Sequence, residues 1–311
     1  MYQFVIDPKA PDFLQSLASE ALPYFKNYFQ KKYSPWQILS YEFFEKPSGR
    51  SVGTILSLIY HDPLSGEFGP RRINFYIKVT HPFDNPVGDW LFYKILEHSG
   101  AGPKVHFFSM LCKGKRIFLI ATQDIQFTKH VNTVKNVEQD AIASCTDGKA
   151  NGPAETHNQR AVLELLSNIL GLTDLVVCNY GYVRTTRADF SPYYKLKIFD
   201  FDYPKHFGGE ADYEVSMRCR GIESAFGKEV TQFALQQLQS GRFISRDGKE
   251  CYKSSLAAAI LRAYTDIENY AISHQNFLDV QSVKQDLEKF KSTLFNNYNL
   301  FRRHLNAGDY L

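Results

Sequence analysis

Three carboxylates and one carboxamide stand at the ends of two apolar segments in the second half of the chain. Asp174 and Asn179 are five positions apart in ILGLTDLVVCNYGYV, a pattern typical of a helix that ends and continues as a strand. Asp200 and Asp202 stand near the end of a second apolar strand, KLKIFDFDY. Such a carboxylate can accept a proton from a hydroxyl group, and carboxylate and amide oxygens can bind a metal ion.

Asp174, Asn179 and Asp202 could also have purely structural roles. A D-x-x-x-x-N match arises by chance several times in a chain of this size, so Asp174 could cap a helix and Asn179 could occupy a turn. Asp202 could cap the turn after its strand. Asp200 has the stronger case for a site, because an acid at the end of a buried strand is costly unless it is paired or metal-bound.

A lysine in the first half could complete such a site. Lys78 lies inside the apolar strand INFYIKVT, where it is either an edge residue that reaches water or an ammonium that faces a cleft. The helix that follows offers Asp89 near its start and Glu97 near its end as partners for that ammonium. We favour Asp89, because Glu97 falls in the terminating turn, although Asp89 could simply be a first-turn acid favoured by the helix dipole.

The elements that must position these residues fall into a β-rich region followed by a helical one. Residues 1–36 form an N-terminal helical extension, whose helix over 12–31 is kinked or divided at Pro23. Residues 37–125 are expected to form a β-rich lobe, a sheet with one helix, in the order β-β-β-α-β-β. Its strands are WQILSYEFF, GTILSLIYH, RRINFYIKVT, KVHFFSML and KRIFLIATQDI, and its helix lies in NPVGDWLFYKILEHSGAGP.

The polar, Gly- and Ser-rich residues 126–156 read as a hinge or mobile loop. Residues 157–311 then read as a helical lobe that carries the two strands with the acids, with later helices at roughly 221–240, 254–275 and 279–305. The expected class is therefore α+β: an antiparallel sheet with one helix, followed by a mainly helical lobe.

The order of these features resembles the protein-kinase-like superfamily. Lys78 matches the strand lysine that contacts the α- and β-phosphates of ATP, and Asp89 matches the helix acid that pairs with it. Asp174 matches the catalytic-loop aspartate, Asn179 the metal-binding asparagine, and Asp200 the aspartate of the D-F-G element. The resemblance implies a two-lobed kinase-like fold.

The resemblance covers about residues 37–300 and is closest to atypical branches. ILGLTDLVVCNYGYV is similar to the catalytic loop of phosphatidylinositol kinases and related atypical kinases. HSGAGPKVHFF and FDFDY are more similar to elements of choline and ethanolamine kinases. This mixture indicates the superfamily without selecting a subfamily.

Several positions depart from the kinase pattern. The first hairpin, KPSGRSVG, keeps Gly49 and Gly53, which could let backbone N–H groups approach phosphates, but it is not G-x-G-x-x-G and a plain turn is equally consistent. Leu172 and Thr173 replace the His and Arg of H-R-D, and Asp202 replaces the Gly of D-F-G. No A-P-E follows, which disfavours an ordinary Ser/Thr or Tyr kinase.

The resemblance implies a phosphotransferase that uses ATP and Mg²⁺ and delivers the γ-phosphate to a hydroxyl group of a protein, lipid or small molecule. Backbone groups from Ala121 to Asp124 would contact adenine, while Asn179 and Asp200, with Asp202 beside them, would hold the metal. One alternative is a pseudokinase that binds nucleotide or acts as a scaffold. Another is a structural protein whose acids only cap turns.

Bulk composition sets limits on partners. The 311 residues carry a formal net charge of +3, and no dense Lys/Arg run indicates nucleic-acid binding. No apolar run reaches membrane-spanning length. Five widely spaced cysteines without a C-x-x-C pair argue against a metal cluster or a disulfide framework, so a cytoplasmic setting is expected. The sequence leaves the oligomeric state open.

Overall fold

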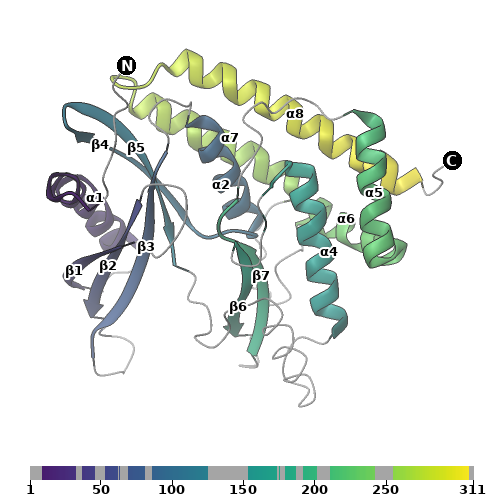
Figure 1. Cartoon of the computed structure of the whole chain (residues 1–311), viewed down its shortest axis with the longest axis horizontal. Coiled ribbons are helices and arrows are strands. Elements are labelled where there is room, and N and C mark those ends of the chain that lie inside the picture. Colours follow the sequence, from purple (N-terminus) through teal and green to yellow (C-terminus); the bar gives the residue numbers. More distant parts are fainter. Residues whose placement is uncertain are drawn as a thin grey trace. The chain divides into compact units, whose positions relative to one another are not determined.

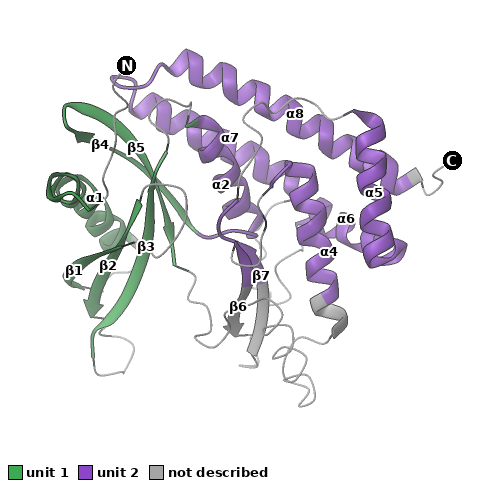
Figure 2. Cartoon of the chain, viewed as in Figure 1, with its two compact units in different colours: residues 1–86, 104–124 green, residues 87–103, 125–311 purple. Residues whose placement is uncertain are grey.

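The computed structural model describes most of the chain and divides it into two compact units. Residues 1–86 and 104–124 form unit 1, and residues 87–103 and 125–311 form unit 2 (Figure 2). The described residues are 9–32, 37–45, 53–61, 63, 69–80, 86–124, 153–173, 175, 179–186, 192–201, 211–241 and 255–307.

Unit 1 is built on a five-stranded antiparallel sheet with strand order β1-β2-β3-β5-β4 (Figure 1). The bounds of its elements are α1 (Pro11–Lys32), β1 (Gln37–Glu45), β2 (Gly53–His61), β3 (Arg71–Val79), β4 (Val105–Cys112) and β5 (Lys115–Gln123). Strands β4 and β5 are joined by a two-residue turn in which Lys113 and Gly114 both have positive φ, the turn geometry that suits a tight hairpin. This bears out the expected α+β class with an antiparallel sheet.

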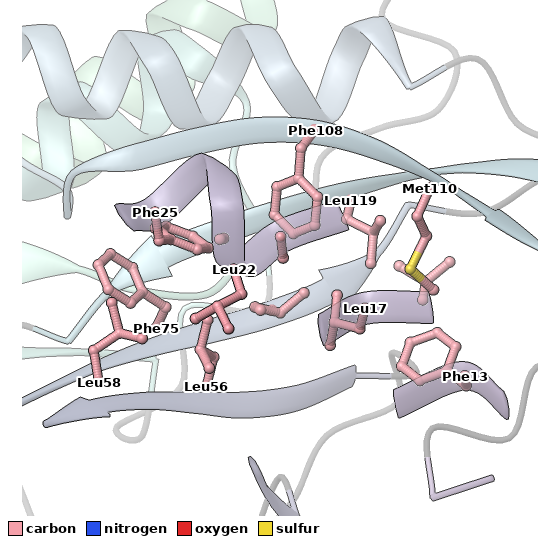
Figure 3. Packing of buried hydrophobic residues seen from close by; sticks show 14 of the residues in the cluster. Phe13, Leu17, Leu22, Phe25, Leu56, Leu58, Phe75, Phe108, Met110 and Leu119 are labelled. Atoms are coloured by element: carbon pink, nitrogen blue, oxygen red, sulfur yellow. The ribbon is translucent and has the colours of Figure 1, made fainter. Parts of the chain in front are cut away.

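Helix α1 packs on one face of the sheet through a stripe of residues spaced four apart. Phe13, Leu17, Ala21, Phe25 and Phe29 are at most 1% exposed, and this spacing places them on one side of the helix. They form a single core with alternate strand residues, including Leu56, Leu58, Phe75, Phe108, Met110 and Leu119 (Figure 3). Each fully buried Leu or Phe side chain contributes roughly 1.5–3 kcal/mol to folding, so this core fixes which face of every strand is turned towards α1.

Unit 2 is mainly helical and contains one two-stranded hairpin (Figure 1). Its elements are α2 (Val87–Ser99), α4 (Pro153–Leu170), β6 (Tyr180–Thr186), β7 (Pro192–Ile198), α5 (Asp212–Phe226), α6 (Lys228–Ser240), α7 (Leu256–Ser273) and α8 (Val280–Ala307). Helix α2 packs against α7, where the rings of Trp90 and Tyr270 meet edge-on at 5.1 Å. The helix expected to complete the sheet lobe therefore belongs to the helical unit.

The helix bounds differ from expectation at four places. Helix α1 runs through Pro23 as one element, so it is not divided there, and the alternative expectation of a kink stays a prediction. Helix α4 begins at Pro153, inside the segment expected as a hinge, whose residues 125–152 lie outside the described part of the chain. The helix expected at 221–240 is two helices, because Gly227 adopts φ 85° between α5 and α6. Helix α5 also starts nine residues before the expected position, at Asp212.

No helix among the described residues is long and apolar enough to span a membrane.

Candidate functional site

Lys78 lies near the end of β3, on the face of the sheet opposite to α1. Its neighbours Ile77 and Val79 are buried in the core with α1, and alternation along the strand directs Lys78 to the other face, which it shares with the exposed Tyr76. Lys78 is half-buried. The sequence therefore placed this lysine on a β-strand correctly, and the structure adds that it is turned away from the main core of unit 1.

Gly53 is the direct cross-strand neighbour of Lys78. A Cβ atom at Gly53 would lie 2.3 Å from the backbone oxygen of Ile77 and 3.2 Å from Cα of Lys78. The glycine is thus required for the close approach of β2 to β3, independently of any phosphate. Gly49, the other glycine predicted to approach phosphates, lies outside the described residues.

The backbone groups predicted to contact adenine are mostly engaged within unit 1. Ala121 lies on β5 between Ile77 of β3 and His106 of β4, so a neighbouring strand is present on each side of it. Asp124 donates its backbone N–H to the carbonyl oxygen of Asn74 at 2.8 Å, and its carboxylate accepts the Asn74 side-chain amide at 3.3 Å. An adenine contact through Ala121 and Asp124 stays a prediction.

Asn179 and Asp200 are brought together by the β6–β7 hairpin. Tyr180 is the first residue of β6 and pairs with Ile198, the last residue of β7. Asn179, just before β6, therefore adjoins the residues that follow β7. The carbonyl oxygen of Asn179 accepts the backbone N–H groups of Phe199 at 2.8 Å and of Asp200 at 3.3 Å. Two residues separated by 21 positions thus share one end of the hairpin.

The two other predicted acids of this region, Asp174 and Asp202, lie outside the described residues. The chain that leads to Asp174 is described: α4 ends at Leu170, and Gly171 takes a left-handed φ of 64°. The N–H of Leu172 then donates a hydrogen bond to the carbonyl oxygen of Ser167 at 2.9 Å, which provides a partner for one of the last carbonyl groups of the helix. The L-G dipeptide before Asp174 is therefore explained by helix termination.

Tyr93 of α2 contacts Asp200, a contact that the sequence pattern did not predict. Its hydroxyl group donates a hydrogen bond to Oδ1 of Asp200 at 3.2 Å, and its ring packs on Phe201 with centroids 4.6 Å apart. The available signal was the spacing from Asp89, because residues four apart share a helix face. The partner, 107 positions away, was not predictable from local pattern.

Polar contacts on α2 separate the two candidate partners of Lys78. Glu97 forms an ion pair with Lys94, with 2.7 Å between Oε2 and Nζ, and the same Nζ lies 3.7 Å from Oδ2 of Asp266 on α7. Asp89 lies half-buried in the first turn. The pairing of Lys78 of unit 1 with Asp89, the partner favoured from the sequence, stays a prediction.

Asp266 links α7 to the last turn of α2. His98 Nε2 lies 2.9 Å from its Oδ2. Partial burial opposes ionisation of Asp266, but the His98 hydrogen bond and the Lys94 charge together lower the pKa of its carboxyl below the ordinary value. This cluster anchors the helix that carries Tyr93 and Asp89.

The pair of Asn179 and Asp200 fits a magnesium ion bound mainly through phosphate. Mg²⁺ is typically held by one or two protein oxygens together with substrate phosphates and water, and both side chains supply hard oxygen atoms. Within the described part of the chain, no group of three or more His, Cys, Asp or Glu side chains is arranged as a metal site. This donor set suits a nucleotide-bound ion better than a permanent structural metal.

Comparison with known proteins shows a weak structural likeness. No protein-family model and no curated protein sequence matches this chain. A crystal structure of CtkA, a proinflammatory kinase of Helicobacter pylori, matches with a TM-score of 0.40 and 15% sequence identity, covering 87% of this chain and 98% of that one. At this level the match assigns neither a family nor an activity to the chain.

Proposed function

We propose that this protein is an ATP- and Mg²⁺-dependent phosphotransferase of atypical kinase-like, two-lobed fold, which transfers the γ-phosphoryl group to a hydroxyl acceptor. The acceptor is a protein, a lipid headgroup or a small molecule. The residues that support this activity come from both halves of the chain.

The observation that carries the proposal is the adjacency of Asn179 and Asp200 at one end of the β6–β7 hairpin. Their spacing in the sequence does not bring them together; the antiparallel register does. An asparagine and an aspartate whose backbones adjoin at one end of a short hairpin can supply an amide oxygen and a carboxylate, the kind of oxygen pair that holds a nucleotide-bound cation.

Each remaining residue has a role in this proposal. Lys78 holds the α- and β-phosphates and is kept in place by Asp89, while Asp174 orients the acceptor hydroxyl and accepts its proton. Asp202 stands beside Asp200 as a further metal-binding acid. When bound, Mg²⁺ neutralises the charge that develops on the transferred phosphoryl group. Catalysis then requires mainly positioning and fixed charge.

The test is ATP turnover by the wild type compared with Asp174→Asn. Loss of the carboxylate that orients and deprotonates the acceptor is expected to lower the rate by at least 10²-fold, the usual scale of general-base catalysis. Glu229→Gln is a matched control, because it removes an exposed first-turn acid of α6 that has no part in the site. Equal rates for wild type and Asp174→Asn would reject catalysis.

A nucleotide-binding pseudokinase is the second candidate, favoured by Leu172 at the position of the H-R-D histidine. Leu172 is an apolar side chain only 8% exposed, which suits packing more than chemistry. ATP binding without turnover in the same assay would select this function over the first.

We place either activity in the cytoplasm. Cys112 and Cys219 are buried thiols, which suits a reducing compartment.

A further inference from the structure

We infer that Tyr93 is a positioning residue for Asp200, whose carboxylate it holds in the orientation that receives the nucleotide-bound cation. The inference rests on the proposed function, since it assigns a role to a contact of the metal-binding acid. It names a residue to which neither the sequence pattern nor the resemblance gives this role.

Two donors fix the carboxylate of Asp200 from one side. The Tyr93 hydroxyl and the backbone N–H of Phe201 both donate to Oδ1, each at 3.2 Å. A carboxylate that accepts two hydrogen bonds on the same oxygen loses much of its freedom to rotate.

The donor itself is held rigidly. Tyr93 is only 2% exposed, and its ring packs against Phe201 at 4.6 Å with planes at 44°. A buried tyrosine hydroxyl requires a hydrogen-bond partner, and Asp200 Oδ1 is the acceptor in reach. Because the ring and the hydroxyl contact consecutive residues, Phe201 and Asp200, Tyr93 sets both the position and the rotation of this short segment.

The helix that carries Tyr93 is fastened to unit 2 at its far end. Asp266 of α7 binds His98 at 2.9 Å and Lys94 at 3.7 Å. Just beyond the helix, the carbonyl oxygen of Ala101 accepts the N–H of Ile198, the last residue of β7, at 2.7 Å. Two polar contacts therefore join the α2 region to the end of the hairpin: the backbone bond between Ala101 and Ile198, and the side-chain bond between Tyr93 and Asp200.

The chemical consequence concerns affinity for the cation. A side chain that orients a metal ligand through a hydrogen bond typically changes metal affinity 10- to 100-fold when it is removed. The bond here is made by an uncharged donor at 3.2 Å, so we expect an effect at the lower end, about tenfold. Packing should persist in Tyr93→Phe, which retains the ring that contacts Phe201.

The experiment measures Mn²⁺ binding, as a paramagnetic substitute for Mg²⁺, by the loss of the free-ion EPR signal in the presence of a non-hydrolysable ATP analogue. Wild type, Tyr93→Phe and Asp200→Asn are compared. Tyr264→Phe is the matched control, because Tyr264 also donates to a carboxylate of unit 2, that of Glu288, but not to Asp200. Thermal denaturation of all four proteins reports whether each is folded.

We expect Tyr93→Phe to bind Mn²⁺ about tenfold more weakly, Asp200→Asn to lose binding, and Tyr264→Phe to match the wild type. A change in Tyr93→Phe of less than about threefold, or tighter binding, would overturn the inference while the loss in Asp200→Asn upheld the proposed site. If the wild type and Asp200→Asn bind equally, or neither binds, the proposed site fails and the inference fails with it.

Discussion

Replacing Gly53 by alanine should destabilise the protein strongly, for a reason that has no connection with nucleotide. The added Cβ would meet the Ile77 backbone oxygen at 2.3 Å and the Ile77 carbonyl carbon at 3.3 Å. Close carbon–oxygen contacts between adjacent strands normally fall at about 3.3–3.6 Å. Strand β2 would therefore have to withdraw from β3 by about 1 Å at this point, and neither obstructing atom belongs to a flexible side chain.

The magnitude follows from two costs. Forcing an extra carbon into a packed site costs about 1–3 kcal/mol, and weakening one hydrogen bond of the ladder costs about 1 kcal/mol more. The expected loss in free energy of unfolding is thus about 2–4 kcal/mol.

The assay is urea denaturation followed by far-UV circular dichroism, without nucleotide. The control is Gly221→Ala on α5, where a Cβ would have nothing within 4 Å and the backbone φ is ordinary. That variant should be more stable than wild type by about 0.5–1 kcal/mol, because alanine favours a helix over glycine. If Gly53→Ala were within about 0.5 kcal/mol of wild type and lost only its response to ATP, close approach of phosphate would explain the glycine instead.

Two further predictions concern pH. The pKa of Asp266 is lowered in the folded state, so its contacts with His98 and Lys94 should stabilise the protein at pH values above the ordinary carboxyl pKa of 3.8 and cease to do so as the pH falls below it. Asp266→Asn should lower the free energy of unfolding by at most about 1 kcal/mol at pH 7. In acid, the urea midpoint of this variant should converge with that of wild type. Burial and the Glu288 carboxylate raise the pKa of Tyr264 to about 12, so wild type should lose stability as the pH rises from 10 towards 12. In Tyr264→Phe that alkaline loss should be smaller, and an equal loss in both proteins would show that this hydroxyl group is not responsible.

The strands of unit 1 were predictable because their residue pattern and their burial agree. On β3, Phe75, Ile77 and Val79 are buried while Tyr76 is exposed, and each strand begins and ends within about two residues of the predicted bounds. Alternation of apolar and polar residues is a local signal, and α1 supplies one apolar face for every strand to meet. Local information therefore sufficed.

The partner of α2 was not predictable in the same way. Trp90, Leu91, Phe92 and Tyr93 are consecutive and all buried, so the helix has no polar side that would indicate which neighbour it packs against. The expectation that it completes the sheet lobe followed from its place in the chain. Its packing on α7, more than 150 residues later in the chain, is decided by long-range tertiary contacts that the local sequence does not reveal.

The early start of α5 was missed for the opposite reason. Its buried residues form a narrow stripe, Val215, Cys219 and Ile222, within a polar segment. So thin a stripe gives little periodic signal.

The candidate site was predicted in part. The strand ends of Asn179 and Asp200 were chosen from the sequence because polar oxygens follow apolar runs, and the hairpin places these two together. The roles of Lys78 and Asp174 stay predictions. Tyr93 could not be assigned in advance, because a phenol in an apolar helix is more often part of the core, and only the folded chain brings its hydroxyl to Asp200.

The central claim is that Asp200 belongs to a site for a nucleotide-bound cation, and the change in Tm with ligand tests it most directly. A ligand that binds only the native state at 100 times its Kd stabilises it by about 2.7 kcal/mol. We expect ATP with Mg²⁺ to raise the Tm of the wild type by several degrees and ATP with a chelator to raise it less. Asp200→Asn should abolish the difference between these two conditions. Identical Tm values for the wild type with and without saturating ATP and Mg²⁺ would contradict it.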